Sequence, residues 1–414
     1  MSSEVVIKAK EARIAARKLA NVSTAVKNKA LETIAHALEV SYERILVENK
    51  KDIDRASQRG MSPAMIDRLT LTKERVLSMA EGVRQVASLE DPVGHILSEQ
   101  RRPNGLLIRK ITVPLGVIAI IFESRPNVTV DAAVLCLKSG NACVLRGGSE
   151  AIHSNVVLVQ VIQEALQKAE LPTAAVELIE NTDRALVKEL LTLRPYIDLA
   201  IPRGGAGLIQ MVVNTATVPC IETGSGVCHV YVDKYADLDM AVNIVENAKV
   251  SRPSTCNAME TLLVHEAVLA PFLEKLKPRM VQQHVELRGD AQIQALGIEK
   301  AATEEDWQTE YNALILSIKA VPSLEAALAH IRQYSTHHSE AIVTEDKERA
   351  AMFLADVDSA AVYVNASTRF TDGFEFGFGA EIGISTQKLH VRGPMGLTAL
   401  VSYKYQIQGQ GQIR

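Results

Sequence analysis

Apolar residues recur at helical spacing over the first part of the chain. The pattern is clearest from Leu31 to Leu38 and from Val76 to Val86, where apolar positions lie three or four residues apart. That spacing places them on one face of a helix. Residues 1 to about 90 are therefore predicted to form helices only, and these helices are expected to cover a sheet formed later in the chain.

The pattern then changes to two strand-like runs around a turn. Residues 95–102 and 106–112 flank Pro103-Asn-Gly105, and Asn-Gly between two such runs is the strongest short signal for a β-hairpin. Apolar and polar residues also alternate from Val401 to Gln408, which is typical of a strand with one covered face. A hairpin this polar needs a partner sheet, so we expect an assembly role, with the tail joining the hairpin of another subunit.

Between these segments, short apolar runs alternate with helical patterns. One series spans residues 113–223 and the other spans residues 228–390. The first series is expected to end on a strand at Val218–Ile221, and the second to run from a strand at His229–Val232 to one at Ala361–Asn365. Short buried strands separated by helices indicate parallel sheets covered on both faces.

Two glycine-rich loops follow strands of the first series. They read Leu145-Arg-Gly-Gly-Ser-Glu150 and Ile201-Pro-Arg-Gly-Gly-Ala-Gly-Leu208. A loop that leaves a strand and opens a helix directs backbone N–H groups toward an anion, and parallel sheets bind nucleotides at the carboxyl ends of their strands. Neither loop has the dinucleotide fingerprint or the P-loop sequence, so a dinucleotide site and ordinary loop glycines both remain open.

Composition and charge narrow the class of protein. The chain has 414 residues, of which 47% are hydrophobic and 23% charged, as in a globular protein of two or three domains. The net charge of −4 argues against nucleic-acid binding. The longest apolar run, Val113–Phe122, is too short for a membrane span. We also expect no targeting segment, because Glu4 and Glu11 are unlike a mitochondrial presequence.

The cysteines suggest neither disulfides nor a metal site. There are five, at irregular spacing, which favours a reducing, cytoplasmic setting. No pair has the C-x-x-C spacing of a zinc site. Cys228-His229 lies in strand-like sequence that we interpret as core. No metal is therefore expected.

Cys256 differs from the other cysteines because it lies between a loop and a strand-like run. The loop is Ser251–Thr255 and the run is Thr261–His265, and a helical pattern at Leu238–Lys249 precedes both. Loop residues at the ends of elements reach the surface of a rigid scaffold, so this thiol could meet a ligand. A small buried hydrophobic residue is the alternative interpretation.

Several motifs together resemble the aldehyde dehydrogenase superfamily. They are Pro114-Leu-Gly-Val-Ile-Ala-Ile-Ile121, Gly140-Asn-Ala-Cys-Val-Leu-Arg146, Glu222-Thr-Gly-Ser-Gly226 and Cys256. The 34 positions between Glu222 and Cys256 match the superfamily's spacing between its acidic residue and its nucleophile.

Finer motifs are similar to those of the branch of the superfamily that reduces L-glutamyl 5-phosphate. They lie at residues 122–127, 201–207, 251–256, 338–342 and 378–386. The resemblance covers essentially the whole chain. It implies an oxidoreductase of proline biosynthesis that uses NADPH and forms L-glutamate 5-semialdehyde and phosphate.

The resemblance also implies an architecture. The fold class is α/β and aldehyde-dehydrogenase-like, with two parallel-sheet Rossmann-like domains and a small β oligomerisation element. Residues 1–94 and 113–227 would form the NADP-binding domain, and residues 228–396 the catalytic domain. Residues 95–112 and 397–414 would form the oligomerisation hairpin and tail of a homo-oligomer. Contact with glutamate 5-kinase, which makes the labile acyl phosphate, is left open.

The resemblance assigns the catalytic residues. Cys256 would attack the acyl phosphate and form a thioester, and a donor in the loop after residues 117–122 would stabilise the oxyanion. We assign that donor to Asn127, although counting places Arg125 nearer the family position and a helix N-cap is the alternative role. Glu222 lies where the superfamily has its general base. A structural carboxylate is the alternative, because this reaction uses phosphate rather than water.

Cofactor contacts are assigned in the same way. Arg146 with Ser149 would suit the 2′-phosphate of NADP(H), and Glu310 would contact the nicotinamide ribose. The glycines that would let the backbone approach the pyrophosphate are Gly204, Gly205 and Gly207.

Three arginines are assigned to the small-molecule substrate, either to its phosphate or to its α-carboxylate. They are Arg125, Arg252 and Arg369. An ordinary surface position is the alternative for each.

Two other functions fit parts of the sequence. An ordinary aldehyde dehydrogenase would hydrolyse its thioester, and an inactive scaffold would bind the cofactor without turnover. The Glu-Ser-Arg-Pro-Asn loop at 123–127 and the short chain argue against the first, and Cys256 argues against the second.

Overall fold

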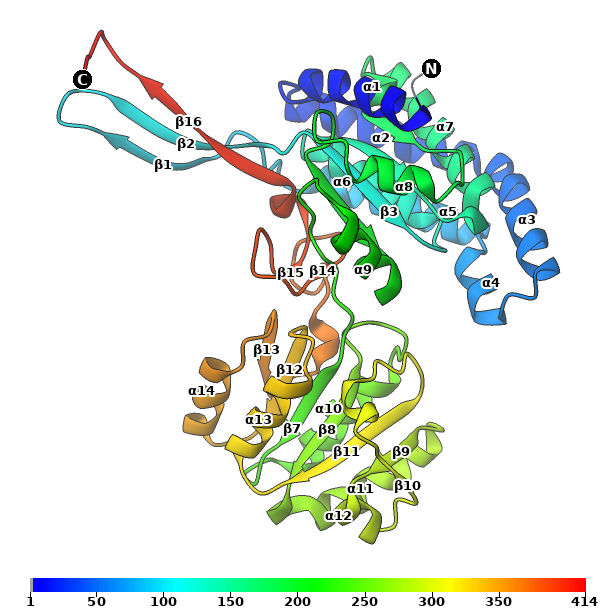
Figure 1. Cartoon of the computed structure of the whole chain (residues 1–414), viewed down its shortest axis with the longest axis vertical. Coiled ribbons are helices and arrows are strands. Elements are labelled where there is room, and N and C mark those ends of the chain that lie inside the picture. The colour runs from blue at the N-terminus through cyan, green and yellow to red at the C-terminus, as the bar shows by residue number, and fades with distance from the viewer. Residues whose placement is uncertain (1–2) are drawn as a thin grey trace. The chain divides into compact units, whose positions relative to one another are not determined.

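The computed structural model describes residues 3–414, which form two compact units (Figure 1). The first unit contains residues up to 223 together with residues 377–383 and 395–414. The second contains residues 224–376 and 384–394. The chain first passes from the first unit to the second after Thr223, and the domain ranges given above stay predictions. The roles assigned to the two parts stay predictions.

The first unit opens with helices, as the spacing of apolar residues predicted. Leu31, Ile34 and Leu38 are fully buried. Helix α2 packs on α5, and α1 lies against strand β4 of the sheet that follows. The helices are α1 (Glu4–Leu19), α2 (Thr24–Val40), α3 (Tyr42–Gln58), α4 (Pro63–Leu69) and α5 (Lys73–Ser88).

A parallel sheet with the strand order β5-β4-β3-β6 forms the centre of the first unit. Every residue of β3 and β4 is buried, as expected for strands covered on both faces. The strands are β3 (Val117–Phe122), β4 (Ala142–Arg146), β5 (Val176–Leu178) and β6 (Leu199–Arg203). The helices that alternate with them are α6 (Asn127–Lys138), α7 (Ile152–Lys168), α8 (Ala185–Leu190) and α9 (Ala206–Thr215).

The strand expected at Val218–Ile221 is wrong. The structure has only an isolated bridge between Ala200 and Cys220 there. Pro219 has no backbone N–H to donate to a ladder, which confines proline to edges and irregular positions of a sheet. The segment therefore touches β6 at one point and continues as a loop.

A second parallel sheet forms the core of the second unit, in the order β10-β9-β11-β8-β7-β12-β13. Apolar clusters cover both of its faces. The strands are β7 (Cys228–Val232), β8 (Met259–His265), β9 (Glu286–Gly289), β10 (Lys300–Ala301), β11 (Ile315–Val321), β12 (Ser339–Val343) and β13 (Ala361–Val364). The helices are α10 (Leu238–Val250), α11 (Leu269–Gln282), α12 (Ala291–Ala295), α13 (Leu324–Tyr334) and α14 (Lys347–Asp356). None of the helices described in either unit is long and apolar enough to cross a lipid bilayer.

A separate antiparallel sheet in the first unit joins the hairpin to the tail. Its strands are β1 (Ile96–Arg101), β2 (Leu107–Pro114) and β16 (Val401–Gln408), and β2 lies in the middle. Figure 1 shows this sheet extending away from the helices of its unit. We expected the tail to join the hairpin of another subunit, but β16 pairs with β2 of the same chain along its whole length. The assembly role stays a prediction.

Candidate functional site

Three loops of the first unit leave the same edge of its sheet. They follow β3, β4 and β6, and β3 lies between the other two strands. Because parallel strands end at one edge, the loops that begin at Glu123, Gly147 and Gly204 are neighbours. The chain leaves β3 toward β4 and later returns to its other side as β6, and this change of direction is the usual position of a nucleotide crevice in such sheets.

The loop after β6 presents the N-terminus of α9. The backbone N–H of Gly205 donates to Oε2 of Glu123 at 3.1 Å. A Cβ on Gly204 would overlap that carboxylate, whereas one on Gly207 would meet nothing within 4 Å. The helix N-terminus already accommodates a negative group, as its partial positive charge favours. This acceptor, Glu123, was not predicted from the sequence.

Arg146 is buried at the end of β4. Its guanidinium donates to the backbone oxygens of Gly147 at 2.6 Å and Thr182 at 2.8 Å, and its Nε is buried without a partner among the described residues. Burial lowers the pKa of Arg146 from its ordinary value. Ser149 begins a short 3₁₀ turn three residues later. The two residues proposed for the 2′-phosphate therefore lie in one loop.

A carboxylate connects this loop to the loop after β3. Oε1 of Glu150 accepts from the backbone N–H of Ser124 at 2.7 Å and from its hydroxyl at 2.8 Å. Ser124 has a φ of 47°, a conformation that is uncommon for residues other than glycine. Gly148 allows the approach, because a Cβ there would overlap the Glu150 carboxylate. The contact fixes the turn that precedes Arg125 and Asn127.

Asn127 does not cap α6. Pro126 is the N-cap and Asn127 is the first helical residue, and its amide donates to Oδ2 of Asp131 at 2.9 Å. The N-cap alternative for Asn127 is therefore wrong. Burial raises the pKa of Asp131 to about 6, and the bond from Asn127 and the charge of Arg203 oppose the shift. Arg125 is half-buried in the turn before the helix.

Glu222 is half-buried near the end of the first stretch of chain in the first unit. Its neighbour Thr223 is anchored by a hydrogen bond from its hydroxyl to the Pro202 oxygen at 2.8 Å. Burial raises the pKa of Cys220, and the charge of Glu222 adds to that shift. Cys136, Cys143 and Cys228 are buried as expected, whereas Cys220 is half-buried.

In the second unit, Cys256 lies in a turn between α10 and β8, as predicted. It is half-buried. The turn is closed by hydrogen bonds from the N–H of Thr255 to the Arg252 oxygen and from the N–H of Ala258 to the Thr255 oxygen. Arg252 itself is exposed.

The backbone of Cys256 lies directly against Gly226. A Cβ on Gly226 would overlap the carbonyl oxygen of Cys256. The N–H of Gly226 donates to Oε1 of Glu310 at 2.9 Å. Glu310, assigned above to the nicotinamide ribose, therefore holds the segment that supports the Cys256 turn.

Arg369 clamps the Cys256 turn from both sides. Its guanidinium donates to the hydroxyls of Ser251 at 3.0 Å and Thr255 at 2.8 Å, and to the side-chain oxygen of Asn257. Burial and the nearby charge of Arg252 lower the pKa of Arg369, and a negative charge on Cys256 opposes this shift. Positive charge beside a thiol favours its reactive thiolate form.

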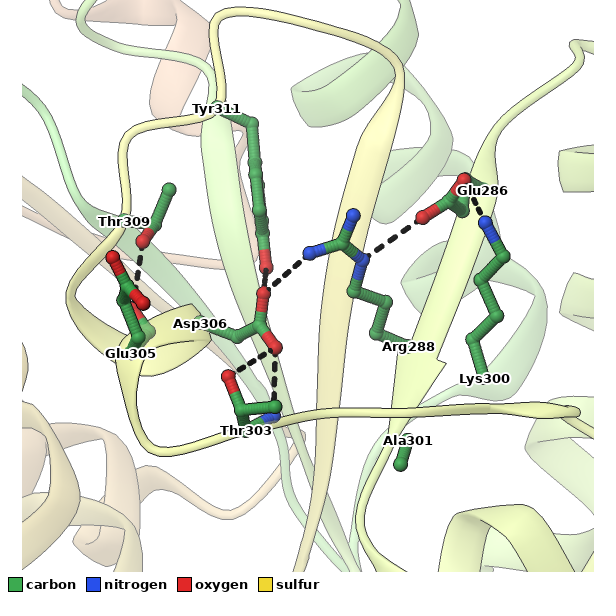
Figure 2. A pocket seen from close by; sticks show the side chains of 9 residues that line it. All are labelled: Glu286, Arg288, Lys300, Ala301, Thr303, Glu305, Asp306, Thr309 and Tyr311. Carbon is green, nitrogen blue, oxygen red and sulfur yellow. Dashed lines mark hydrogen bonds and ion pairs between the residues drawn. The ribbon is translucent and has the colours of Figure 1, made fainter.

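A hollow of about 520 Å³ lies next to the loop that carries Glu310 (Figure 2). The charged side chains that line the hollow form hydrogen bonds with one another. Arg288 donates to Asp306 at 2.6 Å and to Glu286 at 2.9 Å. The hydroxyl of Tyr311 also donates to Asp306, at 2.6 Å. These bonds fix Tyr311, and with it the adjacent Glu310.

The structure thus places the site residues in two groups. The first unit brings together Arg146, Ser149 and the Gly204–Gly207 loop at one sheet edge. The second unit brings Arg252, Arg369 and Glu310 around Cys256. Sequence reasoning missed Glu123 and Glu150. Glu150 ends one glycine-rich loop, whereas Glu123 lies in the loop after β3, far along the chain from the Gly205 N–H that it accepts from. Across residues 3–414, no group of three or more His, Cys, Asp or Glu residues is arranged to hold a metal ion.

Comparisons with known proteins are consistent with one another. A model of the aldehyde dehydrogenase family matches residues 2–304. A gamma-glutamyl phosphate reductase of Carboxydothermus hydrogenoformans is 58% identical over 413 residues, which cover 99% of each chain. One of Heliobacterium modesticaldum is 56% identical over all of this chain and 99% of its own. The crystal structure of the gamma-glutamyl phosphate reductase of Thermotoga maritima matches with a TM-score of 0.97 at 49% identity, and both chains are covered completely.

Proposed function

Because the chain belongs to the aldehyde dehydrogenase family and, within it, to the γ-glutamyl phosphate reductases, we propose a specific reaction and mechanism for it. The chain is an oxidoreductase with the α/β fold of that family. It reduces L-glutamyl 5-phosphate with NADPH to L-glutamate 5-semialdehyde and phosphate, in the cytoplasm, through a thioester on Cys256.

The observation that carries this proposal is the position of Cys256. The thiol is half-buried in a turn that Arg369 clamps, with Arg252 close to the same guanidinium. Two positive charges favour the thiolate and can receive an anionic acyl phosphate.

The Cys256 sulfur attacks the acyl carbon, and the carbon–oxygen bond to phosphate breaks as phosphate leaves with that electron pair. After reduction of the thioester, the carbon–sulfur bond breaks, which releases the aldehyde and restores the thiolate. Asn127 is the proposed oxyanion donor. Since phosphate replaces water, Glu222 is proposed to act as a structural carboxylate rather than a base.

The first unit has features that fit a nicotinamide dinucleotide. Gly204 provides a position that a Cβ would block, at the N-terminus of α9 beside the Gly205 N–H. Arg146 retains a buried Nε without a partner among the described residues. Arg146 and Ser149 are proposed to hold the 2′-phosphate of NADPH, and Glu310 the nicotinamide ribose. When bound, the cofactor supplies the hydride.

The reaction can be tested in reverse. Glutamate semialdehyde and NADP+ are supplied with and without phosphate to the wild type and to Cys256→Ala, and NADPH is followed by absorbance. We expect NADPH only with phosphate, and none from the variant. Turnover without phosphate would indicate an ordinary aldehyde dehydrogenase. Cofactor binding without turnover would indicate a scaffold, and full activity of Cys256→Ala would exclude the thioester.

The protein is also proposed to assemble as a homo-oligomer through β1, β2 and β16. Tyr405 and Ile407 of β16 are 58% and 60% exposed, and Ile96 of β1 is 55% exposed. Exposed apolar residues on a projecting sheet favour a protein partner. Sedimentation of Ile407→Lys beside the wild type tests this proposal, and an unchanged mass would contradict it.

A further inference from the structure

The carbonyl group of Cys256 contacts strand β7 in addition to Gly226. The Sγ of Cys228, the first residue of this strand, donates to the Cys256 oxygen at 3.2 Å. Gly226, two residues earlier, is the glycine whose Cα lies against the same carbonyl. A single carbonyl is therefore held by one close approach and one hydrogen bond from a three-residue segment.

A series of polar side chains that contact one another begins at Cys228. Nδ1 of His338 lies 3.7 Å from the Cys228 sulfur and 2.8 Å from the Ser339 hydroxyl. That hydroxyl is 2.6 Å from the hydroxyl of Thr371, which is 2.7 Å from the hydroxyl of Tyr363. His338 and Ser339 belong to the motif at 338–342, which the proposed function leaves without a role.

These supporting groups leave the thiol few orientations. The backbone N–H of Ser339 donates to the Cys228 sulfur, and Cys228, His338 and Ser339 are all fully buried. A sulfur that accepts from the Ser339 N–H directs its own S–H toward the Cys256 oxygen. Burial, with negative charge on Glu340 nearby, raises the pKa of Cys228 well above its ordinary value. The thiol therefore remains a donor rather than a second nucleophile.

Asn257, the residue after Cys256, is held by Thr368 and by Thr371, which belongs to the same series of polar contacts. The hydroxyl of Thr368 donates to the Asn257 backbone oxygen at 2.7 Å, and the Asn257 amide donates to the Thr371 oxygen at 2.9 Å. Thr371 thus contacts both the His338–Ser339 chain and Asn257. Together with the bonds from Arg369 to Thr255 and Asn257, these contacts restrain the residues on both sides of Cys256 in the sequence.

We propose that Cys228 is a positioning residue for the nucleophile, held in place by His338 and Ser339. Its S–H fixes the Cys256 carbonyl, which limits rotation of the peptide and keeps the Cys256 sulfur directed at the acyl carbon. The proposal rests on the function proposed above for Cys256. Because Cys228 is fully buried, it acts through Cys256 and changes the rate of the chemical step rather than substrate binding.

The test compares Cys228→Ala with Cys228→Ser in the phosphate-dependent assay. Loss of one net hydrogen bond corresponds to about a fivefold change, so we expect kcat of Cys228→Ala to fall about five- to tenfold with KM unchanged. Serine retains a donor at the same place, so Cys228→Ser should recover most of kcat. Ser339→Ala keeps the thiol and the backbone N–H that donates to it but removes the hydroxyl that contacts His338, and its kcat should fall between those two values.

A second readout does not depend on turnover. Alkylation of Cys256 by iodoacetamide, followed by mass spectrometry of its peptide, should slow in Cys228→Ala by a factor similar to that for kcat. Thr261→Val is the matched control, because Thr261 is fully buried in the same sheet and its hydroxyl has no partner among the described residues. Its kcat and alkylation rate should equal those of the wild type.

The outcomes separate this inference from the proposed function. Wild-type protein without phosphate-dependent turnover would contradict the proposed function. A wild type that turns over, with Cys228→Ala equal to it in kcat and alkylation, would overturn only the positioning role. Equal losses in Cys228→Ala and Cys228→Ser would also overturn it, since packing alone would then explain the effect.

Discussion

The Cα of Gly226 lies against the backbone carbonyl of Cys256 so closely that no side chain fits between them. The obstructing atoms belong to backbone, so they cannot move aside as the end of a flexible side chain can.

We expect Gly226→Ala to lower the free energy of unfolding by about 2–3 kcal/mol, as overpacking does, and to abolish most activity. Urea unfolding and the phosphate-dependent assay measure the two effects. Gly82→Ala is the control, because Gly82 lies inside α5 with nothing within 4 Å of a Cβ. It should instead gain about 0.5–1 kcal/mol. A Gly226→Ala protein as stable and active as the wild type would show that the Cys256 turn tolerates displacement.

Arg369 combines three hydrogen bonds to the Cys256 turn with a positive charge near the thiol. Arg369→Ala should reduce kcat by about 100-fold, since hydrogen bonds from a charged group contribute about 1.5–3 kcal/mol. It should also slow alkylation of Cys256. Arg369→Lys should recover only part of the rate, because lysine keeps the charge but not the planar fork.

The control is Arg332→Ala, which removes an exposed ion pair with Asp356 and should change the free energy of unfolding by less than about 1 kcal/mol. Full activity of Arg369→Ala would refute the clamp.

Glu123 occupies the N-terminus of α9, where the cofactor's pyrophosphate is proposed to bind. A phosphate group must displace this carboxylate or approach it against charge repulsion. Glu123→Gln should therefore bind NADPH about three- to tenfold more tightly, which corresponds to roughly 1 kcal/mol of relieved repulsion at an exposed site. Titration by cofactor fluorescence measures the change. Glu299→Gln, at an exposed residue elsewhere, controls for net charge. Weaker binding by Glu123→Gln would mean that the carboxylate assists the cofactor.

The carboxyl group of Asp131 should make stability depend on pH. Burial raises its folded pKa to about 6, whereas an unfolded aspartate has a pKa near 3.9. The folded state therefore binds more protons between these values, and its stability falls as pH rises from about 4 to about 6. Asp131→Asn should remove that cost and add about 1–2 kcal/mol at pH 7, after allowance for partial exposure. The gain should vanish near pH 4 in urea unfolding. An equal gain at both pH values would show that the charge is not responsible.

The regular parts of the fold could be predicted because their periodicity is strong. The helical spacing around Leu31–Leu38 and the apolar runs of β3 and β4 each have one structural interpretation. Strands β9 and β10 were missed because Glu286–Gly289 and Lys300–Ala301 are short and mostly polar. The strand predicted at Val218–Ile221 is wrong because its apolar pattern fits a strand, whereas Pro219 has no N–H to donate to a ladder.

The site also contains residues that could be predicted from the sequence and residues that could not. Cys256 was found because its place between a loop and a strand is visible along the chain. The contacts that support it were not, since Cys228 lies 28 positions away and reads as an ordinary core residue. Its donor role depends on how β7 lies beside the turn before β8, and local sequence does not encode that relationship. The bond from Gly205 to Glu123 was missed for the same reason.

The discontinuous first unit has a consequence for how the chain is made. Its parallel sheet and its α-helices come from residues before 224, but β16 is synthesised only after the whole of the second unit, which ends at residue 394. Until then, β2 lacks the neighbour that covers one of its edges, and an uncovered strand edge can pair with other chains. A ribosome-bound intermediate would thus carry an incomplete amino-terminal half, so chaperone dependence should be greatest just before residues 401–408 emerge.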